Sequence, residues 1–377
     1  MVRAEERDIP PRRASRVAPP AYVARASEEV LSPSGGAPSA FQSIGAQSDI
    51  QYHAMAAGRL LNAPEQTGMG FWSINPYVGC AFGCTYCYAR YAHSYVMERG
   101  EAAGTLEPGM RSDVERLPPW LAFERRILVK QGASGALRAS LARGGTRHRT
   151  LRTGESIVIG TATDPYQPAE RRFRVTRGLL EVLAEHKGLQ IVVITKSPLI
   201  TRDLDLLSRM AARSTLSIHL SLITLDRDLA RRIEPRAPTP DARLRTLRRL
   251  REAGIDTGVN CMPVLPGITD DPRALEALVR QVAELGATYV GACALRLQRS
   301  ARARYLPFIE REFPALHGKY RSQYASSHQV NDRYRQGLGR LMSKLCDRYG
   351  VRWRNYRSDD DVQEAPIDES AVQLSLF

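Results

Sequence analysis

The strongest constraint on the fold is a regular alternation of short apolar runs and amphipathic stretches between residues 156 and 296. Runs rich in Val and Ile are typical of buried strands, and the stretches between them repeat their apolar residues with helical period. We expect strands at 156–162, 190–195, 216–224, 256–265 and 287–296, and helices at 173–186, 200–213, 241–254 and 272–286. This order predicts an α/β fold of parallel βα units, whose ligands bind at the carboxyl ends of the strands.

Elements outside this repeat are less regular. An apolar run at 71–78 precedes it and predicts a sixth strand. Helices are expected at 88–99 and 117–130, and residues 301–357 are expected to be helical and basic. Residues 1–66 contain Pro-Pro pairs and a Ser-, Gly- and Pro-rich stretch without periodicity, which predicts a disordered tail.

Three of the six cysteines, Cys80, Cys84 and Cys87, follow the first predicted strand with the spacing C-x3-C-x2-C. Thiolates at this spacing can converge on one metal centre. Three thiolates would leave one iron of a [4Fe–4S] cube without a protein ligand, whereas cubane clusters that carry electrons generally have four cysteines. A structural zinc site is the alternative interpretation, because zinc takes four ligands and His93 could supply the fourth.

Polar side chains lie where successive strands are predicted to end. Thr161, Thr163 and Asp164 stand in GTATDPYQPAERR (160–172), Lys196 in ITKS (194–197) and Ser221 in HLSLIT (219–224). Each alone is more often a capping or surface residue. Their recurrence at neighbouring strand ends favours a binding site there.

Taken in order, NPYVGCAFGCTYCYAR, GTATDPYQPAERR, ITKS, TLD, EPRAPTP and PGITD resemble the spore-photoproduct-lyase-like branch of the radical S-adenosylmethionine (SAM) superfamily. The resemblance covers about residues 71–296. It implies a partial (β/α)6 TIM-type barrel, a [4Fe–4S] cluster bound by the three cysteines, and SAM chelated to the open iron. It further implies that SAM cleavage yields a 5'-deoxyadenosyl radical, and that Tyr86, Thr163, Lys196 and Ser221 contact the cofactor.

The chain departs from that branch at one position. The lyase has a cysteine three residues before the strand-end Asp, where it returns a hydrogen atom to the product radical, and this chain has Thr161. A hydroxyl O–H bond is far stronger than a thiol S–H bond and donates poorly to a carbon radical. We therefore expect a radical SAM enzyme that is not a true spore photoproduct lyase, with Cys261 or Cys293 as alternative donors. No catalytic residue is assigned.

The charge of the chain is strongly positive and uneven. The net charge is +14, and residues 359–377 hold six acids and no Lys or Arg, so the first 358 residues carry +20. Such a field favours a polyanion, and we expect nucleic acid as the partner in a reaction akin to DNA repair. The rival hypotheses are a radical enzyme with a protein or small-molecule substrate and a non-enzymatic, zinc-stabilised nucleic-acid-binding protein.

The predicted organisation is a tail (1–66), a radical SAM core (67–300), a basic helical extension (301–357) and an acidic flexible tail (358–377). The chain ends in QLSLF, which resembles the peptide by which bacterial repair and replication proteins bind the DNA polymerase sliding clamp. Apolar side chains would fill a cleft and the amide would orient them: Leu374, Leu376, Phe377 and Gln373. The sequence lacks a signal peptide and any apolar run of about eighteen residues, so we expect a cytoplasmic location.

Overall fold

The computed structural model describes residues 41–64 apart from 42 and 59, residues 70–104, 118–142 and 154–355, and the single residues 106, 110 and 151. Its main sheet has the strand order β12-β11-β10-β9-β8-β7-β4-β3. The six strands expected from the sequence are parallel neighbours in it: β4 (Trp72–Ile74), β7 (Ser156–Ile159), β8 (Gln190–Thr195), β9 (Thr215–Ser221), β10 (Asp256–Val264) and β11 (Tyr289–Ala294). The expected α/β fold of six parallel units is confirmed, and the described sheet is open, with β12 and β3 at its edges, as expected of a partial barrel.

The four expected connecting helices are present as α8 (Val175–Ala184), α9 (Leu204–Ala211), α11 (Pro240–Glu252) and α12 (Pro272–Glu284). Shorter elements accompany them, namely α7 (Ala169–Phe173), η2 (Pro198–Asp203) and α10 (Arg227–Ile233). Helices α11 and α12 begin with the sequence signals of a helix start, because the Thr239 and Asp271 side chains each accept a backbone N–H and proline follows. Each of the four buries an apolar face, which covers the sheet.

A second sheet corrects two expectations. Strands β1 (Ser43–Gln47), β2 (Ile50–Ala56), β6 (Arg126–Gln131) and β5 (Tyr77–Val78) pair in the order β1-β2-β6-β5. The tail expected to reach residue 66 therefore contains β1, β2 and also β3 (Leu61–Asn62). The helix expected at 117–130 is wrong after α4 (Pro119–Arg125), since the following residues form β6.

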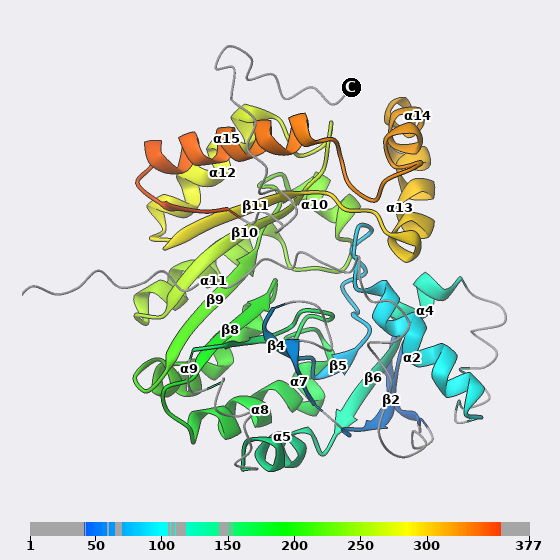
Figure 1. Ribbon diagram of the computed structural model, residues 1–377, viewed down its shortest axis with the longest axis vertical. Helices are drawn as coiled ribbons and strands as arrows, with labels where there is room; N and C mark the ends of the chain where they lie inside the picture. The colour runs from blue at the N-terminus through cyan, green and yellow to red at the C-terminus, as the bar shows by residue number, and fades with distance from the viewer. Residues whose placement is uncertain are drawn as a thin grey trace, which may run out of the picture.

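Residues 126–131 form a strand because of their tertiary contacts. Ile127, Leu128 and Val129 in β6 are buried, and β6 pairs in parallel with β2, which gives this segment partners that local propensity cannot register. In Figure 1 this sheet lies beside the main sheet, next to α2 (Arg90–Ala102) and α4, while α5 (Ala133–Ala142) lies below α8.

The C-terminal extension folds onto the core. Helices α13 (Arg299–Glu312), α14 (Pro314–Gln323) and α15 (Asp332–Arg348) confirm its helical character, but β12 (Arg352–Asn355) is a strand that pairs in parallel with β11. The helices share one apolar cluster with the main sheet, and Figure 1 shows α13 and α14 on the side that also carries α2 and α4. Within the described residues, every helix is too short or too polar to span a lipid bilayer.

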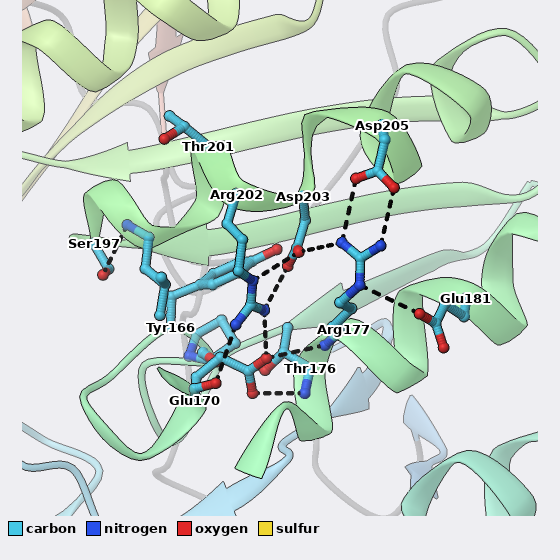
Figure 2. Close-up of polar contacts among 12 residues, drawn as sticks. Tyr166, Glu170, Thr176, Arg177, Glu181, Ser197, Thr201, Arg202, Asp203 and Asp205 are labelled. Carbon is cyan, nitrogen blue, oxygen red and sulfur yellow. Dashed lines mark hydrogen bonds and ion pairs between the residues drawn. The ribbon is translucent and has the colours of Figure 1, made fainter. Parts of the chain in front are cut away.

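A buried polar network secures the segment that follows β7 (Figure 2). Glu170 of α7 is fully buried and accepts hydrogen bonds from the Thr176 and Arg177 backbone N–H groups at 2.8 and 3.1 Å. Arg202 of η2 donates to Glu170 at 2.7 Å, and Asp203 accepts from Arg177 at 2.7 Å. The network therefore joins α7, α8 and η2, so that the ends of β7 and β8 are held at a fixed spacing.

Candidate cofactor site

The three cysteines lie on one loop between β5 and α2. Gly79 and Gly83 take φ angles of +85° and +65°, which side chains rarely adopt. A Cβ atom on Gly79 would stand 2.8 Å from the carbonyl oxygen of Phe123, and the Cys80 N–H donates to that same carbonyl at 2.9 Å. Glycine at this entry lets the loop approach α4 closely.

A buried ion-pair network anchors the other side of the loop. Arg90 is fully buried, and its Nη2 atom donates to the carbonyl of Cys84 and to Glu124, each at 2.7 Å. Glu124 also accepts from Arg236, which follows α10, and from Arg304 of α13, both at 3.4 Å. Because these groups come from separate parts of the chain, the network fixes the loop relative to the rest of the fold.

The cysteine loop faces a cavity of about 200 Å³. One water needs only about 10–15 Å³ by the same measure, so the cavity has room for a ligand. The ends of the parallel strands form its opposite wall, as the sequence predicts for such sheets. Every site residue expected from the sequence lines it: Cys80, Cys84, Cys87, Tyr86, Thr163, Lys196 and Ser221.

Lys196 brings a cation into the cavity at the end of β8. Its Nζ atom lies 3.8 Å from Glu234 Oε1 and 5.9 Å from the centre of the Tyr86 ring. Burial alone would lower the pKa of Lys196, but the nearby Cys84 sulfur and the Glu234 carboxylate raise it overall. The ammonium group therefore stays charged and can attract a carboxylate.

Glu234 is the functional residue to which sequence reasoning gave no role. It is buried, its Oε1 atom accepts from the Tyr86 hydroxyl, and its Oε2 atom pairs with Arg243, which is also buried. Burial favours the neutral acid, yet Arg243 and Lys196 lower the pKa of Glu234 overall. The motif EPRAPTP contained this residue, but nothing local indicated its distant partners.

Thr163 and Ser221 differ in what their hydroxyls do. The Thr163 hydroxyl donates to the Gly79 carbonyl at 2.6 Å and accepts from Gln167 at 2.9 Å, so it holds the entry of the cysteine loop. The Ser221 hydroxyl has no hydrogen-bond partner among the described residues and borders the cavity. Ser221 is therefore the more available of the two for a ligand.

Asp164 lines the cavity, and its carboxylate ties two strand ends together. Its Oδ1 atom accepts from the Thr195 hydroxyl at 2.7 Å and from the Tyr166 N–H at 2.9 Å, and its Oδ2 atom accepts the Lys196 N–H at 2.8 Å. All three donors are fixed by the fold. The carboxylate thus sets the position from which Lys196 projects.

Comparison with known proteins assigns the family. The model of the radical SAM superfamily matches residues 146–278. An uncharacterised protein of Mycobacterium tuberculosis (strain ATCC 25618 / H37Rv) is 32% identical over 334 residues, which cover 87% of this chain and 88% of that protein. One from Methanocaldococcus jannaschii is 25% identical over 197 residues, covering 52% and 61% respectively. This chain belongs to the radical SAM superfamily.

Its fold is similar to that of spore photoproduct lyase. A variant of spore photoproduct lyase in which one tyrosine is replaced by phenylalanine superposes with a TM-score of 0.52 at 14% identity, covering 76% of both chains. Spore photoproduct lyase complexed with a dinucleoside spore photoproduct gives 0.50, also at 14% identity and with the same coverage. As in other radical SAM proteins, the cofactors are a [4Fe–4S] cluster and SAM.

The donor set of the cavity fits a cluster better than a single ion. No three His, Cys, Asp or Glu side chains within the described part of the chain stand close enough together to ligate one metal ion. A cube takes one thiolate per iron, so its thiolates stand farther apart than the ligands of one zinc ion. Burial raises the pKa of Cys80 to about 12, so metal binding there must release a thiol proton.

His93 does not complete a zinc site. It is buried on α2, outside the cavity wall, and its Nε2 atom lies 2.8 Å from the carbonyl oxygen of Arg126. Burial lowers the pKa of His93 to about 4, so the ring is neutral. Its ring packs edge-on against Phe123 with centres 6.1 Å apart. The residue is part of the packing beneath the loop, which removes the proposed fourth ligand.

The position that departs from the lyase also borders the cavity. Thr161 lines it, and its hydroxyl accepts from the Asn75 side chain at 3.0 Å. Of the two other cysteines considered from the sequence, Cys293 lines the cavity, whereas Cys261 is fully buried in β10. A thiol therefore borders the cavity from β11, on a different strand from Thr161.

Proposed function

We propose that this radical SAM enzyme acts on nucleic acid and that Cys80, Cys84 and Cys87 hold its cluster. One observation supports the proposal. Three thiols line the same cavity as the cations and hydroxyls at the strand ends. When bound, the cluster and SAM supply a 5'-deoxyadenosyl radical that abstracts a hydrogen atom from the substrate. An external one-electron donor supplies the electron.

The chain's own residues position the cofactor. The Lys196 ammonium would pair with the carboxylate of SAM, and the Ser221 hydroxyl would donate to a polar oxygen of the same molecule. Tyr86 holds Glu234 in place, and Glu234 in turn holds Lys196. Thr163 acts through the loop that it fastens at Gly79.

Charge and fold support a nucleic-acid substrate. The net charge of +14, with all of the excess before residue 359, attracts a polyanion. The likeness in fold to spore photoproduct lyase, which was solved in complex with a dinucleoside spore photoproduct, supports this proposal. Because Thr161 replaces the cysteine expected there, we propose a repair-like reaction other than that of the lyase.

The test of the radical chemistry is the production of 5'-deoxyadenosine. The protein would be reconstituted anaerobically with iron and sulfide, reduced with dithionite and given SAM. We expect product from the native chain and from Cys346→Ala, a buried cysteine in α15 away from the cavity, but none from Cys84→Ala. A colourless protein without product in any sample would contradict the proposal.

The substrate class is tested by adding DNA. We expect DNA to stimulate deoxyadenosine formation and the stimulation to fall as salt rises, since binding to phosphates releases counterions. Activity that ignores both DNA and salt would instead indicate a protein or small-molecule substrate.

A second partner is proposed from the C-terminal peptide, which lies outside the described residues. We propose that Gln373, Leu374, Leu376 and Phe377 bind the DNA polymerase sliding clamp and bring the enzyme to replicating DNA. A clamp pull-down should lose the protein when Leu376 and Phe377 are both changed to Ala. Equal retention of that variant would contradict recruitment and leave the radical chemistry unaffected.

A further inference from the structure

The wall of the cavity beyond β11 carries positive charge. Arg296, Gln298 and His328 line it, close to Cys293. Two strands, β9 and β10, separate β11 from β8, whose end carries Lys196. The cavity therefore has cations at two separate places, and the cation on β8 is the one assigned to SAM.

Among the described residues, Arg296 has no acidic partner that would neutralise it. It makes no ion pair with any described carboxylate. Among the described residues that line the cavity, Asp164 is the one carboxylate, and three donors from the strand ends already occupy it. A half-buried guanidinium with no local counter-ion is suited to an anionic ligand.

Further guanidinium groups surround His328. Arg302 of α13 donates from Nη2 to the carbonyl of Ser327 at 3.4 Å, and it makes no ion pair within the described ranges. Burial lowers the pKa of His328, and the nearby Arg296, Arg302 and Arg335 lower it further. Arg335 forms an ion pair with Asp332. Arg296 and Arg302 are therefore the cations of this group that no described carboxylate neutralises.

Backbone and side-chain hydrogen bonds hold the segments that carry Arg296 and His328 in place. The Leu297 N–H donates to the carbonyl of His328 at 2.8 Å, which joins the segment after β11 to the loop between α14 and α15. Gln329 lies between His328 and Arg335, at 3.1 and 2.6 Å from them. These hydrogen bonds restrain the segments that carry the cations, which lowers the entropy cost of binding a ligand.

We propose that Arg296, Arg302 and His328 form a phosphate-binding subsite that takes a backbone phosphodiester of the nucleic-acid substrate beside the cofactor cavity. The inference deepens the proposed function and rests on it. Guanidinium forks match the oxygens of a phosphate in a bidentate manner, and the imidazole adds a neutral hydrogen-bonding group. A phosphate held here would place the adjoining nucleotide at the cavity.

The experiment measures binding apart from catalysis. A short fluorescein-labelled oligodeoxynucleotide would be titrated with the reconstituted full-length protein at several salt concentrations, with fluorescence anisotropy as the readout. We expect Arg296→Gln combined with Arg302→Gln to weaken binding about tenfold or more, because the charged hydrogen bonds to phosphate are removed. The slope of log K against log salt should become shallower by about 0.7 for each phosphate that the variant no longer neutralises.

Control experiments distinguish a general loss of charge, a loss of this particular site and a loss of folding. Arg245→Gln combined with Arg248→Gln removes the same two charges from exposed positions on α11 and should change affinity much less. Arg296→Lys keeps the charge but loses the bidentate fork, so its affinity should lie between those of the native protein and the double variant. SAM binding by equilibrium dialysis should be unchanged in the double variant, which also shows that it is folded. An oligomer with a neutral methylphosphonate backbone should bind the native protein and the double variant equally weakly.

The outcomes distinguish the two proposals. DNA binding that depends on salt but is unchanged in the Arg296/Arg302 variant, or is reduced no more than in the Arg245/Arg248 control, overturns the subsite and keeps the nucleic-acid substrate. A native protein that binds SAM but no oligonucleotide overturns both. Displacement of a labelled acidic peptide, with the oligonucleotide unable to compete, would assign the cations to a protein substrate and also overturn the subsite.

Discussion

Glu234 contacts four groups at once, and none of them is its neighbour in sequence. Tyr86 and Arg243 bind its two oxygens, Lys196 lies 3.8 Å away, and the Cys84 sulfur lies 4.0 Å from Oε1. Tyr86 precedes it by 148 residues, a separation at which no local pattern reports contact. The cysteines could be predicted because their spacing is itself the signal, whereas Glu234 becomes visible only in three dimensions.

Removing the Glu234 charge should destabilise the protein. In Glu234→Gln the buried Arg243 loses its counter-ion, and breaking a buried pair from one side costs about 3–5 kcal/mol. Urea unfolding of the cluster-free protein would measure this change. Glu310→Gln on the exposed face of α13 is the matched control, with an expected change within about 0.5 kcal/mol. Equal midpoints for the two variants would refute the buried pair.

His219 should make stability depend on pH. It is buried in β9, its Nε2 atom lies 2.9 Å from Arg354 Nη1, and burial followed by Arg354 holds its pKa well below the usual value. The unfolded chain therefore binds a proton that the folded chain does not bind. Stability is retained above about pH 6.5 and decreases as pH falls, with a slope of up to about 1.4 kcal/mol per unit.

The variant His219→Gln should flatten that dependence, because glutamine can still accept from Arg354 and does not titrate. His186→Gln, at a half-buried site after α8, removes a histidine without touching this hydrogen bond and should keep the native slope. Free energies of unfolding between pH 7 and 5 would be compared. Parallel curves for all three proteins would show that His219 is not the source.

At the scale of elements, the sequence predicted what periodicity can encode. Strand β8 occupies residues 190–195 as expected, and α12 lies within 272–286, because apolar runs and capping residues both point to them. Strand β6 was missed since its sequence, RILVKQ, follows directly on a helix and is fixed by pairing with β2 and β5. Elements whose stability comes from distant partners escape local rules.

The close contact between β10 and β11 can be tested with two glycine-to-alanine variants, which should change the stability of the protein in opposite directions. A Cβ atom on Gly258 would stand 2.1 Å from the Tyr289 ring, so Gly258→Ala should destabilise the sheet by about 1–3 kcal/mol. Gly339→Ala in α15 meets nothing within 4 Å and should stabilise by about 0.5–1 kcal/mol through helix propensity. Thermal unfolding measures both, and a neutral Gly258→Ala would refute the close approach.

At the scale of the whole molecule, the C-terminal extension is part of the core instead of an appendage. Tyr324 donates to the carbonyl of Leu295 at 3.0 Å, and Tyr320 donates to that of Pro266 at 2.7 Å. The sequence suggested a separate basic segment because it is rich in arginine, and several of these arginines are exposed whereas Tyr305, Tyr320 and Tyr324 are buried. The pattern of charges predicts which side chains are exposed, but it gives no information about the aromatic side chains that the extension packs against the core.

Truncation tests this integration. A chain ending at Gln298 loses the cover of β11 and exposes its apolar cluster, so we expect aggregation in size-exclusion chromatography and no cooperative unfolding. A chain ending at Asn355 keeps α13, α14, α15 and β12 and should unfold like the full-length protein. Cooperative unfolding of the shorter chain would show that residues 1–298 form an independent domain.

The hydrogen bonds around the cysteine loop have a consequence for its shape. Arg90 and the backbone groups of Phe123 and Ile233 form hydrogen bonds that hold the loop in its shape. These hydrogen bonds offset part of the conformational entropy that ordering the loop costs. Protein contacts therefore contribute to the shape of the cysteine loop. In zinc fingers, by contrast, the metal itself drives the chain to fold.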